Sequence, residues 1–132
     1  MISRFLITLA LTAAVAAQEI PAKRATDVKI LQGPEIERAD PNFAVIRWLS
    51  NNPGGTDTHY GVVHYGTDPK KLDQQAKSPI RLNRFHTETL FRVRMPELKP
   101  ATTYYYTVDE EEAGGKSDKV RCAVKRFSTP AH

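Results

Sequence analysis

The chain has 132 residues, with 19 Lys and Arg against 15 Asp and Glu, and a net charge of +4. This length suits one domain with a single hydrophobic core. The basic residues are scattered along the chain, which argues against a nucleic-acid-binding protein. Cys122 is the only cysteine, so no internal disulfide can form. We expect its thiol to be buried as a small hydrophobe, the alternative being an intermolecular disulfide.

Residues 1–17 have the layout of a secretory signal peptide: a basic start at Arg4, an apolar run over 5–16, and small residues at the end. The run is shorter than the ~20 residues of a membrane-spanning helix. We therefore expect cleavage after Ala17, rather than a membrane anchor or a buried helix. Gln18 in place of a cysteine argues against a lipid anchor. The prediction is a secreted or periplasmic protein of net charge 18 − 15 = +3 without stable membrane insertion, in which residues 18–26 form a flexible leader and 27–130 one domain.

Short alternating apolar runs, separated by turn residues, follow the leader and indicate an all-β sandwich or barrel. Ala44, Ile46 and Trp48 share one face of a strand, as do Thr89, Phe91, Val93 and Met95 of another. The predicted strands are residues 28–36 (with an edge or bulge at Gly33-Pro34), 43–49, 60–65, 87–95, 104–108 and 120–127. Residues 69–79 fit an edge strand, a helical turn or a loop.

In two of these strands we predict which side chains point toward the core. In residues 60–65, Val63 and Tyr65 are expected to point inward, which leaves Val62 and His64 outward. In the last strand Val120, Cys122 and Val124 share a face that Phe127 does not, so we expect a bulge near residues 125–126.

The segment from Leu98 to Val108, Leu-Lys-Pro-Ala-Thr-Thr-Tyr-Tyr-Tyr-Thr-Val, has the pattern of a tyrosine corner. In such a corner a buried Tyr, here Tyr104, hydrogen-bonds backward to the backbone at the edge of a sandwich. Tyr105 would then be exposed. The predicted core consists of Trp48, Tyr65, Phe91, Val93, Leu98, Tyr104 and Tyr106. Removal of the Trp48 indole should cost ~3–5 kcal/mol.

These residues occur in an order that resembles a fibronectin type III domain: Trp48, then Tyr65-Gly66-Thr67, the corner, and the terminal Phe127-Ser-Thr-Pro130. More narrowly, the chain resembles the domain at the front of purple acid phosphatases and related metallophosphoesterases. The resemblance covers residues 28–130 and implies a seven-stranded immunoglobulin-like β-sandwich. Met95-Pro96-Glu97 before Leu98, and the long acidic tip at residues 110–115, depart from the family pattern.

In purple acid phosphatases two metals are held by a separate catalytic domain, with motifs such as Asp-x-Gly, Gly-Asn-His-Glu and Gly-His-x-His. None of these motifs occurs in the chain. The resemblance therefore supplies no catalytic residue, no cofactor and no metal ligand. We expect a non-catalytic module that binds a protein or an extracellular polymer. The alternative is a detached or truncated front domain of a metal-dependent acid phosphatase; a structural spacer is a weaker third interpretation.

Other chemistry is sparse in the sequence. His59 and His64 lie five residues apart, on opposite faces of a strand, and are interpreted as exposed imidazoles rather than metal ligands. The acidic run 109–112 fits a solvated hairpin tip turning at Gly114-Gly115 better than a calcium loop.

The candidate interaction surface consists of Tyr60, Arg92, Arg94 and Tyr105. The arginines are most simply the solvated face of a sheet, with an anion- or polysaccharide-binding patch as the alternative. An unpaired edge strand is another possible docking element, because its backbone groups are free to pair. We expect a monomer whose partner is unknown.

Overall fold

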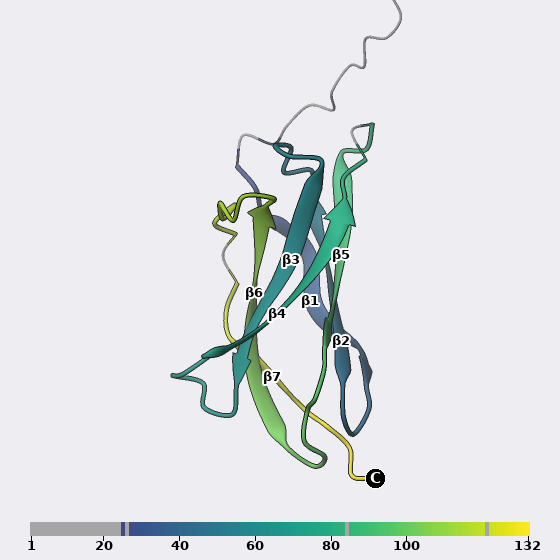
Figure 1. The fold of residues 1–132 in the computed structure, drawn as a ribbon, viewed down its shortest axis with the longest axis vertical. Helices are drawn as coiled ribbons and strands as arrows, with labels where there is room; N and C mark the ends of the chain where they lie inside the picture. The colour runs from purple at the N-terminus through teal and green to yellow at the C-terminus, as the bar shows by residue number, and fades with distance from the viewer. Residues whose placement is uncertain (1–24, 26, 84, 121) are drawn as a thin grey trace, which may run out of the picture.

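The computed structural model describes residues 25, 27–83, 85–120 and 122–132. Over these residues the protein is all-β, with seven strands in two antiparallel sheets (Figure 1). The three-stranded sheet has the order β1 (Ile30–Ala39), β2 (Ala44–Asn51) and β5 (Glu88–Met95). The four-stranded sheet has the order β4 (Gln74–Arg81), β3 (Thr58–Gly66), β6 (Thr103–Glu112) and β7 (Lys125–Ser128). The predicted seven-stranded sandwich is confirmed.

The predicted signal peptide and, apart from Ala25, the predicted leader lie outside the described residues. None of the described residues belongs to a helix long and apolar enough to span a membrane. The C-terminus lies at one end of the long axis (Figure 1). The loops at 52–57, 82–87 and 113–116 gather at the opposite end, which we call the upper end (Figure 1).

The core forms where the inward faces of the two sheets meet. The seven residues expected there are all buried: Trp48, Tyr65, Phe91, Val93, Leu98, Tyr104 and Tyr106. Trp48 of β2 stacks on Phe91 of β5, with ring centroids 5.3 Å apart. Gly61 of β3 faces this pair, and a Cβ there would lie 2.9 Å from Val93 Cγ2. A glycine therefore lets the two sheets approach each other over the indole.

The tyrosine corner is present between β5 and β6. The Tyr104 hydroxyl accepts a hydrogen bond from the Lys99 backbone N–H at 2.9 Å. The Tyr104 ring packs between Tyr65 and Phe127, with centroids 6.1 and 5.8 Å away. Ala101 adopts a positive φ of 49° in the turn. The corner thus joins the two sheets through one buried aromatic side chain.

Several strand boundaries differ from the prediction because tertiary contacts decide them. The ambiguous region after Pro69 contains β4, an edge strand. β1 begins and ends later than expected, and its register shifts between Gln32 and Glu35, around Gly33-Pro34. Val62 lies on the outward side of β3 as expected, but it is fully buried.

The last strand is shorter than predicted. Only Lys125–Ser128 pairs with β6, in regular register and without the bulge expected there. Residues 118–120 and 122–124 have irregular conformation, with Lys119 at a φ of 58°. Cys122 is half-buried and packs against the core, whereas Val124 is exposed. At Cys122 a side-chain hydrogen bond takes the place of backbone strand pairing, because Thr107 Oγ1 donates to the Cys122 carbonyl oxygen at 3.1 Å.

Candidate interaction surface and a buried polar cluster

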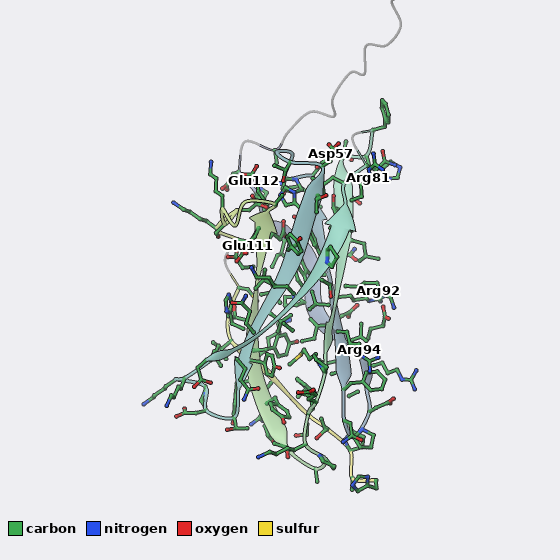
Figure 2. All side chains as sticks on the ribbon, in the orientation of Figure 1. Asp57, Arg81, Arg92, Arg94, Glu111 and Glu112 are labelled. Atoms are coloured by element: carbon green, nitrogen blue, oxygen red, sulfur yellow. The ribbon has the colours of Figure 1, made fainter. Side chains whose placement is uncertain are left out.

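The four residues of the candidate interaction surface do not come together. Arg92 and Arg94 project from β5 on the outer face of the three-stranded sheet (Figure 2). Tyr60 of β3 and Tyr105 of β6 belong to the opposite sheet. Tyr105 is half-buried rather than exposed as predicted, and so is Tyr60. One partner surface cannot use all four, because the two pairs lie on opposite layers of the sandwich.

Two arginines of the three-stranded sheet, Arg47 and Arg92, form ion pairs with glutamates of β1. Arg92 makes a bidentate contact with Glu37 of β1, and its Nε lies 3.0 Å from Glu37 Oε1. Arg47, directly opposite Arg92 on β2, binds Glu35 at 2.9 Å. The hydrogen bond from Arg92 lowers the pKa of the Glu37 carboxyl despite some opposing desolvation. This charge ladder leaves little net positive charge for an anion.

Below the ladder, Phe43 lies between two guanidinium groups. Arg94 Cζ is 4.0 Å from the ring centroid and Arg38 Cζ is 5.3 Å away. Contacts at this distance are cation–π interactions. Arg94 is thus held against the sheet by a neighbouring ring.

Above the ladder the same outer face exposes apolar side chains. Leu31 and Leu90 are 44% and 46% exposed. Leu90 lies opposite Leu49 of β2, and both line a shallow hollow with Trp48 and Gln32. This apolar patch, defined by Leu31, Leu49 and Leu90, lies between the charge ladder and Glu88, which is exposed two residues before Leu90 on the same face of β5.

The acidic run is not a solvated tip, because Glu110 is fully buried. β6 continues to Glu112, and Glu110 points inward beside Gly61 of β3. Its Oε2 accepts a hydrogen bond from Trp48 Nε1–H at 3.0 Å, and its Oε1 lies 3.1 Å from Ser50 Oγ. Burial raises the pKa of Glu110 to about 7, although the hydrogen bonds from Trp48 and Ser50 oppose this.

His59 is also fully buried, contrary to the prediction of an exposed imidazole. Its Nδ1 lies 3.0 Å from the Thr56 carbonyl oxygen and its Nε2 lies 3.1 Å from Asp118 Oδ2. Burial lowers the pKa of His59, but the bonds to Asp118 and Thr56 outweigh it, so that the pKa is raised. His64 lies on the other face of β3 and is half-buried.

The burial of His59 and Glu110 was not predicted from the sequence, because the predicted strands 60–65 and 104–108 are shorter than β3 and β6. Glu110 has the parity of Tyr104, Tyr106 and Val108, and His59 has that of Val63 and Tyr65. Extending either alternation by one step places the polar group inside. A buried indole N–H also needs an acceptor. Within the described residues, no group of three or more His, Cys, Asp or Glu side chains could hold a metal ion.

Comparison with known proteins agrees with this architecture. Residues 35–129 match the model of the purple acid phosphatase N-terminal domain. The sensor domain of the anti-sigma factor RsgI4 from Pseudobacteroides cellulosolvens is 16% identical, with a TM-score of 0.52 over 80% of this chain and 90% of that one. The fibronectin type III domain of human fibronectin type III domain containing protein 3 is 14% identical, with a TM-score of 0.46 over 90% and 94% of the two chains.

The FN5 domain of Drosophila Lar is 15% identical to the chain, with a TM-score of 0.45, over 86% of this chain and all of that one (100%). No curated protein matches the chain significantly. The family model covers more than half of the sequence, from β1 to the end of β7. The chain is therefore a member of the purple acid phosphatase N-terminal domain family.

Proposed function

We propose that the chain is an exported, non-catalytic β-sandwich module that binds a partner protein or an extracellular polymer. The observation that carries this proposal is the apolar patch on the outer face of the three-stranded sheet. Leu31 and Leu90 leave nearly half of their surface in water, beside an arginine-rich ladder. Adjoining apolar side chains that are exposed mark candidate interaction sites, and arginine is enriched at protein interfaces.

The polar groups with shifted pKa values support binding rather than catalysis. Glu110 and His59 are closed off from solvent, and each already bonds to neighbouring protein groups. A general acid or base must reach a proton of the substrate within hydrogen-bond distance. A substrate in solution has no access to either side chain in this packing.

A direct test uses the full chain with a C-terminal tag, recovered from culture medium and immobilised. Its mass should correspond to cleavage after Ala17. Medium proteins and extracellular polysaccharide are passed over the wild type, over a Leu31→Gln, Leu90→Gln double variant, and over Val124→Gln. Val124 is the matched control, since it is 48% exposed but lies outside the apolar patch.

We expect a retained component that the double variant loses and Val124→Gln keeps. Retention unaffected by the double variant would contradict the patch as the binding surface. An absence of any specific ligand on the wild type would contradict the binding function itself.

Family membership favours a second function, that of an accessory domain of a metal-dependent acid phosphatase. Activity would then reside in a separate catalytic domain, which the chain would contact. The test incubates the purified chain with a phosphomonoester and Fe, Zn or Mn, alone and with the product of the neighbouring reading frame. We expect no hydrolysis by the chain alone. Metal-dependent turnover by the chain alone would refute the non-catalytic assignment.

A further inference from the structure

The hydrogen bonds of His59 require a doubly protonated ring. Both ring nitrogens face acceptors, the Thr56 carbonyl oxygen and the Asp118 carboxylate. A neutral imidazole has a single N–H and can donate only one of these two bonds. The imidazolium form satisfies both, and the fully buried ring has no exposed surface through which water could replace either partner.

The bonds of Glu110 fit a protonated carboxyl. Ser50 Oγ lies 2.8 Å from the Asn51 carbonyl oxygen and 3.1 Å from Glu110 Oε1, but a serine has one hydroxyl hydrogen for these two acceptors. A proton on Glu110 Oε1 would be donated to Ser50 Oγ, leaving the serine hydrogen for Asn51. Trp48 Nε1–H then donates to Oε2. In this arrangement every donor has one acceptor.

Acidic groups surround His59 from more than one element. β6 contributes Glu112, the residue paired with His59, and Glu110, two residues before it. Asp118 approaches from the segment after β6. Two basic residues lie on neighbouring backbone: Arg81 of β4 pairs with Thr58, and the Lys116 carbonyl oxygen accepts a hydrogen bond from Glu112 N–H. Asp57 lies in the loop before β3 (Figure 2). The carboxylates of Asp118 and Glu112 favour retention of the imidazole proton.

Asp118 belongs to residues 113–120, which return along β6 and cover its edge above β7. Backbone bonds hold them at the start, where Asp118 N–H donates to the Glu110 carbonyl oxygen at 2.8 Å and Ser117 bridges Glu111. The Asp118 side chain reaches past β6 to His59 on β3. The charged bond therefore ties the segment to a strand that is not its neighbour.

We propose that the protonated His59 ring, through its bond to Asp118, is a proton-dependent clasp that holds residues 113–120 on the sandwich, and that a negative charge on Glu110, whose carbonyl oxygen binds Asp118 N–H, weakens the clasp by repelling Asp118. Release would uncover the backbone groups of β6 between Thr107 and Glu112. An uncovered edge can pair with a strand of another chain. This device is independent of the apolar patch, which lies on the other sheet.

The direction of the pH effect follows from proton linkage. Both groups bind a proton more tightly in the folded state than in the unfolded one, so their contribution is complete at low pH and is lost as the pH rises. For Glu110 the loss runs from pH 4.5 to about 7. For His59 the loss of stabilisation begins near pH 6.5 and continues at higher pH. Within these windows each proton changes the opening constant by up to about tenfold per pH unit.

Amide hydrogen exchange of the full chain, corrected for the intrinsic rate at each pH, measures the opening of residues 113–120 between pH 4.5 and 8. Glu110→Gln is the informative variant because its amide can donate to Ser50 Oγ and accept from Trp48, as the protonated acid does. Glu111→Gln is the matched control, on the outer face of the same strand. Titration of the imidazole resonances compares His59 with His64 and His86.

We expect the wild type and Glu111→Gln to lose protection in residues 113–120 as the pH rises, while Glu110→Gln loses up to about tenfold less per pH unit below pH 7. Asp118→Asn should expose the segment at every pH and bring the titration of His59 back toward 6.5. Equal pH slopes in the wild type and Glu110→Gln would overturn the proposal. So would titration of His59 together with His64 and His86, or equal loss of protection in β2, which would mean global unfolding.

Discussion

Replacement of Tyr104 by phenylalanine isolates the hydrogen bond of the tyrosine corner. The ring stays in place between Tyr65 and Phe127, so the packing of the core is retained. What is lost is the 2.9 Å bond from the Lys99 N–H, which is left without its acceptor at a partly buried turn. One net hydrogen bond and a partly desolvated orphan donor together amount to about 1–2 kcal/mol.

Thermal and urea unfolding measure this cost directly. For a domain of this size, 1 kcal/mol corresponds to a shift in melting temperature of roughly 4–8 °C. Tyr105→Phe is the matched control, because its side chain lies on the outer face and is not part of the corner; we expect a change within about 0.5 kcal/mol. Equal stability of Tyr104→Phe and the wild type would refute the argument that the corner bond stabilises the fold.

Two further predictions concern packing and charge. Gly61→Ala should destabilise the protein by about 1–3 kcal/mol in urea unfolding, because the added methyl would press on Val93 and Trp48. The control Gly114→Ala, whose added methyl meets nothing within 4 Å, should leave the stability unchanged. Equal effects of the two variants would contradict the close approach of the sheets at Gly61. Arg92→Gln should lower the melting temperature slightly at low salt and not at all at high salt, because the ion pair with Glu37 is exposed and is screened by salt. An equal decrease in melting temperature at low and high salt would instead indicate that Arg92 stabilises the sheet by packing.

The sandwich could be predicted from the sequence because alternation and turn chemistry point the same way. Trp48, Phe91 and Tyr104 each follow the period of their strand, and the corner motif fixes the connection between β5 and β6. Residues 69–79 could not be assigned, since an edge strand with Pro79 and few apolar residues carries little periodicity. β7 is short because Cys122 and Ser117 meet β6 through side-chain hydrogen bonds, to Thr107 Oγ1 and Asp109 Oδ2, which no local pattern encodes.

The burial of Glu110 and His59 could not be predicted for a different reason. Charged and titratable residues are rarely buried, so their residue types favour exposed positions. Their burial becomes plausible only when an indole N–H and an aspartate from distant segments are known to face them. The same limit applies to Arg92, whose partner Glu37 lies 55 residues away in the chain. Long-range pairing decides these positions.

The two sheets close over Trp48, and its indole N–H is bonded to the buried Glu110. Because the chain has one tryptophan, hydrogen exchange of the indole N–H can be followed by NMR at pH 5 without ambiguity. We expect a single indole resonance that exchanges as slowly as the core amides of β2 and β5. Exchange at the rate of a solvent-exposed indole would show that the sheets do not enclose Trp48.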